Sequence, residues 1–200
     1  MDIIVARIMK YKNKIFKEKE IKGKNFEEDE FISCKFVNIN FRFSNFSDCQ
    51  FKFCDFSGSF FDIVSFTKCS FPETKLSNSD FSGAQISECD FSDAIMVNCI
   101  FQKLKTGDKN RRKKFSLERS VFEGANLKSA VFVLSKLRRV SFKNARLESA
   151  VFEKCDLTEA DFSGADINAT SFEGSKVEKT LLDLGGFIKF GNSKGFILES

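Results

Sequence analysis

Large apolar residues recur at every fifth position along most of this chain. The first block of these centres consists of Ile21, Phe26, Phe31, Phe36, Phe41, Phe46, Phe51, Phe56, Phe61, Phe66, Phe71, Leu76, Phe81, Ile86, Phe91, Met96 and Phe101. After an interruption the period resumes one residue out of phase, with Leu117, Phe122, Leu127, Phe132, Leu137, Phe142, Leu147, Phe152, Leu157, Phe162, Ile167, Phe172 and Val177. A five-residue period fits neither a helix nor a strand, since either would scatter these side chains over every face. The pattern therefore predicts a chain that turns every five residues and buries every centre.

The positions around each centre are equally regular. Two residues before it the side chain is mostly small, as at Cys34, Ser44, Ala84, Ala125 and Ala160. Two residues after it glycine recurs, as expected where a chain turns with positive φ, at Gly23, Gly58, Gly83, Gly124, Gly164 and Gly174. The remaining positions are mainly Ser, Asp, Asn, Lys and Glu. We expect the small residue and the centre to point inward and the others outward.

This unit resembles that of the pentapeptide-repeat family, which has a small residue, a polar residue, a central Leu or Phe and two variable residues. Residues 160–164 (Ala-Asp-Phe-Ser-Gly) and 165–169 (Ala-Asp-Ile-Asn-Ala) are close matches. The resemblance implies an all-β fold, a four-sided right-handed quadrilateral β-helix with four pentapeptides in each coil. We expect this solenoid over residues 21–180, a basic N-terminal cap at 1–20, an interrupting basic loop at 102–116, and a cap or dimerisation tail at 181–200.

A 20-residue coil is consistent with the distribution of centre types. Centres one coil apart would share a face, and the sets that contain Phe41, Phe61 and Phe81 or Phe51, Phe71 and Phe91 are all Phe in the first block. The other two sets admit Leu, Ile and Met, and in the second block Phe alternates strictly with Leu, Ile or Val. Such alternation of size would fill a narrow interior without voids.

Composition argues against catalysis. The chain has 27 Phe, one Tyr, no Trp and no His, so it lacks the commonest general base and the commonest metal ligand. No glycine-rich phosphate loop or cofactor motif occurs. All seven cysteines occupy the inward small position, where packing explains them; a nucleophile or a metal cluster is the alternative. We predict reduced thiols, no metal, no cofactor and no enzymatic activity.

The net charge of +4 is unevenly distributed. Residues 1–24 carry eight basic and three acidic groups, residues 25–101 five and twelve, residues 102–116 seven and one, and residues 117–200 twelve of each. The acidic body is either an ordinary solvated surface or a mimic of duplex DNA, which has a similar sign and repeat geometry. Candidate outward carboxylates of such a mimic face are Asp55, Asp62, Asp80 and Asp90.

The interruption is rich in basic residues, namely Lys103, Lys105, Lys109, Arg111, Arg112, Lys113 and Lys114. The period cannot continue through it, because Thr106 and Arg111 fall where centres would stand. Three interpretations are open: a solvated insertion, a partner-binding loop, or a basic segment of the kind that directs nuclear import or binds RNA. The pattern is compatible with a loop that removes either eleven residues or one from the coil.

Three smaller features remain. Near the N-terminus Ile4, Ile8, Tyr11 and Ile15 have helical spacing among lysines, which favours a helical cap over a helix on a membrane surface.

Residues 187–200 are expected to form two short strands around a turn and to cap the rod or dimerise it. Phe43 and Ile63 lie two after their centres and one coil apart, which indicates an outward apolar column, either a surface ladder or a partner patch.

Within the family the chain resembles the Qnr-type quinolone-resistance members, which bind DNA gyrase or topoisomerase IV, mimic DNA and protect the enzyme. It implies a protein partner and no direct nucleic-acid binding. The alternative is an interaction scaffold with another partner. The positive net charge and the single evident loop depart from the Qnr pattern. With no export signal and no apolar stretch of about 18 residues, the chain is expected to be cytoplasmic.

Overall fold

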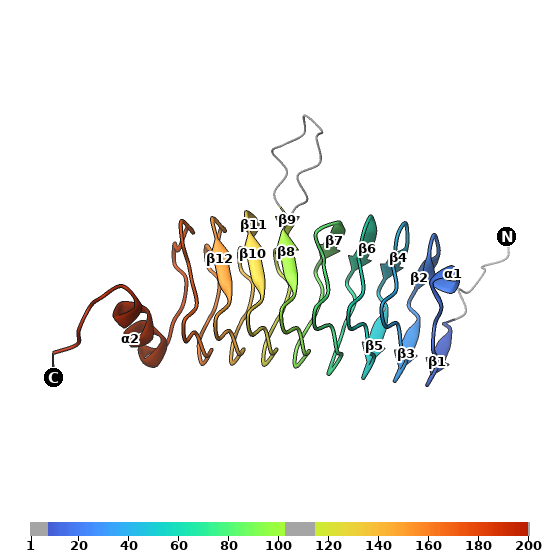
Figure 1. Cartoon of the computed structure of the whole chain (residues 1–200), viewed down its shortest axis with the longest axis horizontal. Coiled ribbons are helices and arrows are strands. Elements are labelled where there is room, and N and C mark those ends of the chain that lie inside the picture. Colours follow the sequence, from blue (N-terminus) through green and yellow to red (C-terminus); the bar gives the residue numbers. More distant parts are fainter. Residues whose placement is uncertain (1–7, 103–114, 200) are drawn as a thin grey trace, which may run out of the picture.

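The structure, a computed structural model, describes residues 8–102 and 115–199. They form a rod of stacked coils that ends in a helix near the C-terminus (Figure 1). Two helices are present in these residues, α1 (Glu18–Ile21) and α2 (Leu184–Ser193). The strands are β1 (Lys10–Lys12), β2 (Asn25–Glu27), β3 (Glu30–Ile32), β4 (Asn45–Ser47), β5 (Gln50–Lys52), β6 (Val64–Thr67), β7 (Ala84–Ser87), β8 (Ile100–Gln102), β9 (Phe115–Ser116), β10 (Val131–Val133), β11 (Ser135–Lys136) and β12 (Val151–Glu153).

Every strand pairing among these residues is parallel, and the paired residues stand one coil apart. Phe26 pairs with Phe46 and Phe46 with Phe66, which gives the 20-residue coil that the sequence predicts. The sheets β1-β3-β5, β8-β10-β12 and β2-β4-β6-β7, together with the pair β9-β11 and isolated bridges, build four sides. The predicted four-sided right-handed β-helix is confirmed, although it begins before residue 21.

We number the four faces by their inward centres. Face 1 contains Ile21, Phe41, Phe61, Phe81, Phe101, Phe132, Phe152 and Phe172, and face 2 contains Phe26, Phe46, Phe66, Ile86, Leu117, Leu137, Leu157 and Val177. Face 3 contains Tyr11, Phe31, Phe51, Phe71, Phe91, Phe122, Phe142 and Phe162, and face 4 contains Phe16, Phe36, Phe56, Leu76, Met96, Leu127, Leu147 and Ile167. Each corner lies two residues after a centre.

The register settles how much chain the interruption adds. Phe101 pairs with Phe132, whereas an uninterrupted coil would pair it with position 121, so the insertion contributes eleven residues. The chain leaves face 1 at Gln102 and is described again on face 2 from Phe115. The insertion therefore belongs to the corner between faces 1 and 2.

The interior is a set of stacked side chains. The rings of Phe31 and Phe51 are stacked at 4.7 Å, and those of Phe81 and Phe101 at 4.8 Å. Small inward residues tie successive coils together, because their side chains donate to a carbonyl of the coil before. The hydroxyl of Ser59, for example, donates to the Phe36 carbonyl at 2.7 Å. Cys54 and Thr170 make the same kind of bond, to the carbonyls of Phe31 and Leu147, whereas Ala, Val or Ile at this position contributes packing alone.

The corner positions have the predicted left-handed backbone. Gly23, Gly58, Gly124, Gly164 and Gly174 all have positive φ, and Asn, Asp, Ser, Lys or Glu take most of the other corners with φ between 50° and 64°. Gly83 is an exception, since its φ is not positive. A Cβ there would lie 2.8 Å from the Asp62 Cα, so this glycine serves close approach of two coils.

The N-terminal segment differs from the expected helical cap. Lys10–Lys12 form β1, the Tyr11 ring stacks on Phe31 at 5.0 Å, and Phe16 is buried against Phe36. Tyr11 and Phe16 continue the five-residue period backwards from Ile21, and that packing outweighs the helical spacing. The helix α1 is four residues long and takes the place of a corner. Ile4 lies outside the described residues.

The C-terminal tail also differs from its prediction of two strands. It contains α2, whose first turn is capped by Asp183, since this carboxylate accepts the Gly186 N–H at 2.6 Å. Phe190 contacts the ring of Phe172 at 5.8 Å and attaches the helix to the last coil. Val177 was expected to be buried but is 54% exposed, because no further coil covers it.

Candidate protein-binding surface

The cysteines offer no accessible chemistry. All seven are buried and are present as thiols. Burial raises the pKa of the Cys99 thiol to about 12, which suppresses the reactive thiolate. In residues 8–102 and 115–199 no group of three or more His, Cys, Asp or Glu side chains could hold a metal ion. No helix in these ranges has the length and apolar content needed to cross a bilayer. The candidate binding residues therefore lie on the outer surface.

Most of the candidate carboxylates stabilise their own turns. An Asp one residue before a centre accepts the backbone N–H two residues later, an arrangement that favours a turn. The N–H of Ser57 donates to Asp55 at 3.0 Å, that of Ser82 to Asp80 at 2.8 Å and that of Ser92 to Asp90 at 2.9 Å. The same contact recurs in the second block at Asp156, Asp161 and Asp166. The frequency of Asp at this position thus has a local structural cause.

The four candidates do not form one face. Asp55 lies on face 4, Asp62 and Asp80 lie on face 1, and Asp90 lies on face 3. Asp62 is also neutralised by Arg42, whose Nε is 3.4 Å from its carboxylate. The expectation of a mimic face made by these residues together is therefore not met, because Asp55 and Asp80 stand one coil plus one pentapeptide apart and so fall on different sides of the rod.

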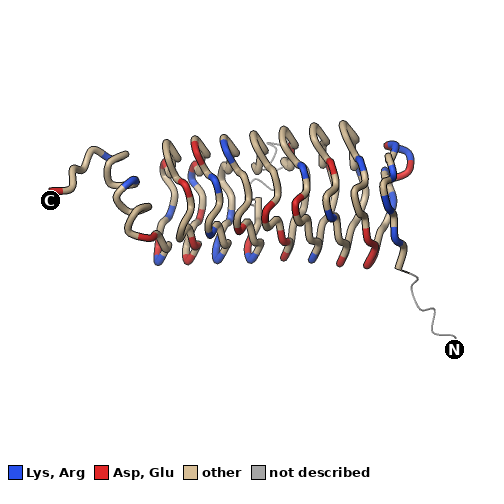
Figure 2. Tube along the Cα trace, turned by 90° about the horizontal axis from the view of Figure 1, so that it is seen from below, with Lys and Arg blue, Asp and Glu red and all other residues tan. Residues whose placement is uncertain are grey.

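A different set of carboxylates does gather on one side. We call it the acidic surface, and it consists of Glu28, Asp48 and Glu88 at the corner between faces 2 and 3, Asp90 on face 3, and Glu73 and Asp93 at the next corner. One basic residue, Lys68, occupies the first of these corners between Asp48 and Glu88. All six carboxylates are exposed, and none forms an ion pair with another residue in the described part of the chain. Figure 2 shows acidic turns along one edge of the N-terminal half, with a basic turn among them. A comparison of corner positions 20 residues apart in the sequence would have revealed these carboxylates.

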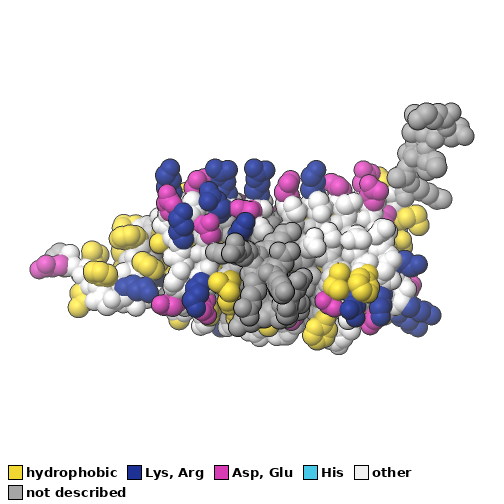
Figure 3. Space-filling model, turned by 90° about the horizontal axis from the view of Figure 1, so that it is seen from above, with side chains coloured by type: hydrophobic (Ala, Val, Ile, Leu, Met, Phe, Trp, Pro, Cys, Tyr) yellow, Lys and Arg dark blue, Asp and Glu magenta, His cyan; other side chains and the backbone are white. Residues whose placement is uncertain are grey.

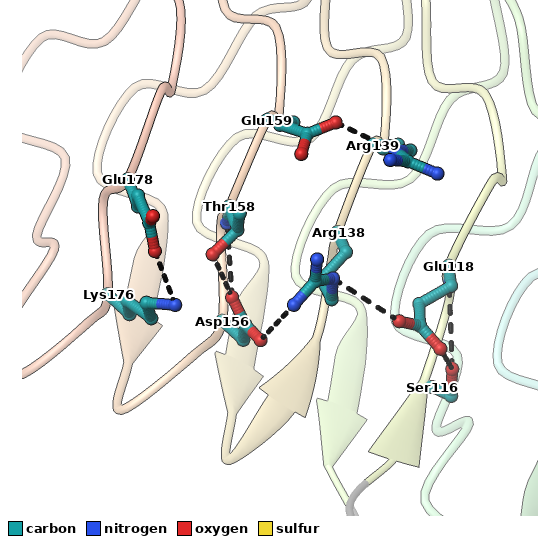
Figure 4. A network of polar contacts seen from close by, with 9 residues as sticks. All are labelled: Ser116, Glu118, Arg138, Arg139, Asp156, Thr158, Glu159, Lys176 and Glu178. Carbon is teal, nitrogen blue, oxygen red and sulfur yellow. Dashed lines mark hydrogen bonds and ion pairs between the residues drawn. The ribbon is translucent and has the colours of Figure 1, made fainter.

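The C-terminal half of that edge is neutralised instead. Arg138 lies between Glu118, at 3.9 Å, and Asp156, at 3.7 Å, while Arg139 binds Glu159 at 2.7 Å (Figure 4). The hydrogen bond from Arg139 lowers the pKa of the Glu159 carboxyl. Lys176 Nζ forms a further ion pair with Glu178 at 2.6 Å. Charges of both signs alternate from coil to coil, so this half carries no net acidic field.

The basic candidates Lys103, Lys105, Lys109, Arg111, Arg112, Lys113 and Lys114 lie outside the described residues. Their two attachment points are placed, since Gln102 and Phe115 flank the corner between faces 1 and 2. The twelve residues from 103 to 114 have seven basic side chains and one acidic side chain. The insertion is therefore attached at the corner between faces 1 and 2, which lies diagonally opposite the corner between faces 3 and 4.

The C-terminal end of the rod is apolar. A pocket of about 300 Å³ opens there, lined by Phe162, Phe172, Val177, Thr180, Leu181, Leu182, Phe187 and Phe190. Leu184 is 77% exposed and Phe187 is 65% exposed on α2. An exposed group of this size on a helix is typical of a protein contact.

Comparison with known families accounts for the repeat. Residues 30–62 and 64–102 match the family of pentapeptide repeats (8 copies), and residues 113–182 match the pentapeptide repeat region. The chain is a pentapeptide-repeat protein. No curated protein shows significant similarity to it.

Several solved structures share the fold of this pentapeptide-repeat protein. A trypsin-treated variant of QnrB1, described as a plasmid-mediated fluoroquinolone resistance protein, is 20% identical with a TM-score of 0.72, and the match covers 97% of this chain and 100% of that one. Full-length QnrB1 is 20% identical with a TM-score of 0.66, and the match covers 94% and 98% of the two chains. At this identity the likeness shows the fold. Pentapeptide-repeat solenoids are in general structural and interaction proteins.

Proposed function

We propose that this protein acts without catalysis, by binding the DNA-binding surface of a type II topoisomerase, gyrase or topoisomerase IV, and protecting the enzyme from quinolones. The observation that carries the proposal is the fold shared with QnrB1 along 97% of the chain. QnrB1 is described as a fluoroquinolone resistance protein. The shared fold makes the same activity the candidate function of this protein.

The geometry of the rod supports DNA mimicry. Face 3 has eight successive centres, so at about 4.8 Å per coil the stack is about 34 Å long, close to one turn of B-DNA. The acidic surface follows this face through the N-terminal half. Carboxylates at that spacing would meet the basic groups that a topoisomerase offers to DNA phosphates. The basic insertion, which has the opposite sign, would make a separate contact with the enzyme.

The decisive experiment is a supercoiling assay with and without quinolone. We expect Asp48→Asn, Glu88→Gln and Asp90→Asn together to weaken topoisomerase binding, and to make the residual binding less sensitive to salt. Asn at position 90 can still accept the Ser92 N–H, so the turn is retained. The matched control is Asp55→Asn, Asp62→Asn and Asp80→Asn, which removes the same charge outside the acidic surface. Equal loss in both triple variants would refute the acidic surface as the contact.

The insertion can be removed without breaking the register. Deletion of residues 103–113 takes out eleven residues and restores the 20-residue spacing between Phe101 and Phe132. We expect the shortened rod to fold and to bind the enzyme through its carboxylates but to lose protection. If neither the full chain nor this variant binds gyrase or topoisomerase IV at micromolar concentration and low salt, the protein is a scaffold for another partner.

We further propose that two copies associate through the apolar C-terminal end. The exposed Leu184 and Phe187 and the pocket beneath α2 would be covered in such a dimer. Sedimentation of the full chain should show a dimer, and Leu184→Ser with Phe187→Ser should give a monomer with unchanged β-sheet circular dichroism. A wild-type monomer at tens of micromolar would refute this contact.

A further inference from the structure

The sheet on face 2 is interrupted inside the rod. Each coil pairs with the next from β2 to β7, and pairing begins again between β9 and β11, but in residues 8–102 and 115–199 no pairing joins β7 to β9. These two strands lie on neighbouring coils (Figure 1), with Cα atoms within 8 Å of each other. Two coil spacings would be about 9.6 Å, so no further strand fits between them. We call this break between β7 and β9 the seam.

The other three faces continue past the seam. Parallel bridges join the coils on its two sides, namely Asp80 with Ile100 on face 1, Asp90 with Val121 on face 3 and Ile95 with Asn126 on face 4. On face 4 the Met96 N–H donates to the Asn126 carbonyl at 2.8 Å. At this level the two parts of the rod are therefore joined on three sides and open on one, and face 4 lies opposite the open side.

Phe115 explains why the sheet opens at this place. It occupies the inward position two before Leu117, where six other coils of face 2 have the smaller residues Ser44, Val64, Ala84, Ser135, Cys155 and Ser175. Phe115 is 5% exposed, and its ring lies 6.3 Å from that of Phe101, so it is packed inside the rod. A large side chain in a space of this kind forces the backbone to shift. The ring of Phe115 thus keeps β9 away from β7.

A buried hydroxyl group shows the same displacement. In the coil before the seam, the Cys89 thiol donates to the carbonyl of Phe66, the face 2 centre one coil earlier, at 3.5 Å. By the same geometry Ser120 would donate to the carbonyl of Ile86. The Ser120 Oγ is instead buried without a hydrogen-bond partner among the described residues. Because such orphaned groups are rare in native structures, this one indicates that Ile86 lies out of reach of the next coil.

The corner between faces 2 and 3 is also loosened beside the seam. The Lys68 N–H donates to the next coil at 2.9 Å, and farther along the Arg139 N–H does so at 3.1 Å. Within residues 8–102 and 115–199, the N–H groups of Glu88 and Arg119 at the same corner make no such bond to the next coil. The open region therefore extends from face 2 to its corner with face 3.

The seam divides face 2 into two surfaces of different character. The outward residues that precede it are mostly uncharged, as at Asn45, Ser47, Ser65, Thr67, Gln85 and Ser87, and those that follow it are mostly charged, as at Glu118, Lys136, Arg138, Asp156, Lys176 and Glu178. Figure 3 shows an uncharged area on the N-terminal side of the grey residues and charges of both signs on the C-terminal side. A change of angle at the seam would move these two surfaces relative to each other.

We propose that the seam, kept open by Phe115, is a hinge at which the rod bends, with face 4 as the pivot and face 2 as the side that opens and closes. At other levels a bend would stretch the backbone hydrogen bonds of a continuous parallel sheet, whereas no sheet pairing between β7 and β9 opposes it here. The hinge sets the angle between the uncharged and charged parts of face 2. The proposal stands whether or not the partner of the acidic surface is a topoisomerase.

Distances between spin labels, measured by double electron–electron resonance, test the bending directly. One pair, Glu27→Cys with Arg138→Cys, spans the seam on face 2, and the matched pair, Val37→Cys with Glu148→Cys, spans the opposite face 4. Each pair crosses five coil spacings, or about 24 Å. The native thiols are buried, and wild-type chain treated in the same way controls for their labelling. We expect the distance distribution on face 2 to be at least twice as broad as that on face 4. Equal widths on the two faces would overturn the proposal.

Amide hydrogen exchange measured by NMR provides a second test on the unmodified chain. The Glu88 N–H should exchange at least tenfold faster than the Lys68 N–H, which occupies the same corner one coil earlier and is hydrogen-bonded. Equal protection of the two amides would contradict an open seam.

The matching variant is Phe115→Ser, which places at this position the residue found at Ser44 and Ser135. We expect the seam to close, so that the face 2 distribution narrows to the width on face 4 and exchange at Glu88 slows at least tenfold. The control Phe53→Ser removes a ring that is 47% exposed at another corner and should change neither measurement. A face 2 distribution as broad as that of wild type in Phe115→Ser, or equal narrowing in the control, would refute the hinge. Phe115→Val takes its place if the Ser variant does not fold, since Val64 occupies the equivalent position.

Discussion

Replacing Phe71 by Ala measures how much one inward ring contributes to the rod. Phe71 is 1% exposed, and its ring is stacked between Phe51 at 4.9 Å and Phe91 at 4.8 Å. A buried Phe→Ala change costs about 3–5 kcal/mol, and each lost aromatic pair is worth about 0.5–1.5 kcal/mol beyond the buried area. The coils above and below are fixed by parallel hydrogen bonds and cannot collapse into the gap. We therefore expect a loss near the upper end, about 4–5 kcal/mol.

Thermal unfolding followed by circular dichroism is a suitable assay. For a chain of this size, 1 kcal/mol corresponds to about 2–4 °C, so the midpoint should fall by about 8–20 °C. Phe60→Ala removes the same ring from a side chain that is 58% exposed, and its effect should be about 1 kcal/mol or less. Equal shifts for the two variants would refute the argument that stacked inward rings hold the coils together.

Three further outcomes follow from burial and charge. Because desolvation raises the pKa of Cys54 and Cys99 to about 12, Ellman's reagent should react slowly with the native thiols and rapidly in denaturant; fast native reaction would contradict their burial. The N–H groups of Gly186 and Gly164 lower the pKa of Asp183, so the docking of α2 should be stable above the ordinary carboxyl pKa and weaken as pH falls through the lowered value, seen as faster amide exchange in α2. Trypsin should cut first within residues 103–114, which carry seven basic residues and interrupt the repeat, and leave two associated fragments; earlier cleavage between residues 40 and 90 would refute this.

Inward positions were predictable because each must satisfy the same narrow interior. The five-residue period located nearly every buried centre, and the 20-residue coil followed from the Phe columns. The boundary was wrong at the N-terminus, where Tyr11 and Phe16 belong to the period but Ile15, at helical spacing, is 69% exposed. The size of the insertion could not be predicted, since removing one residue or eleven leaves Phe on the same pair of opposite faces. Pairing of Phe101 with Phe132 was needed to decide.

The tail shows what a period cannot predict. Once the repeat ends, capping and docking decide the structure, and the signals were an Asp at position 183 and a Gly at position 195, which has φ of 86°. These mark the two ends of a helix. The aromatic residues between them, Phe187 and Phe190, stand three apart and share a helical side. Residues 187–200 alone lack the capping Asp183, and without it their pattern favours two strands around a turn.

Outward positions were harder to interpret because local structure and function both select them. Asp before a centre is favoured by its own turn, so Asp80 or Asp55 carries little information about a partner. Exposed carboxylates at corners, such as Asp48 and Glu88, make no such bond within residues 8–102 and 115–199. Their arrangement on one edge is visible only when positions are compared at the coil repeat. The most informative outward residues are those that the local backbone disfavours.

Ile63 is the strongest case. A β-branched side chain at φ of 50° is disfavoured by about 1–2 kcal/mol, whereas Asn commonly adopts this conformation. Because the exposed Ile63 gains little from packing, Ile63→Asn should raise the free energy of unfolding by about 1 kcal/mol. The reverse change at an equivalent corner, Asn78→Ile at φ of 59°, should lower it by a similar amount. Both are measured by urea titration followed by circular dichroism. A loss of stability in Ile63→Asn would mean that this side chain packs to hold the rod together, and would refute the argument that the backbone disfavours it.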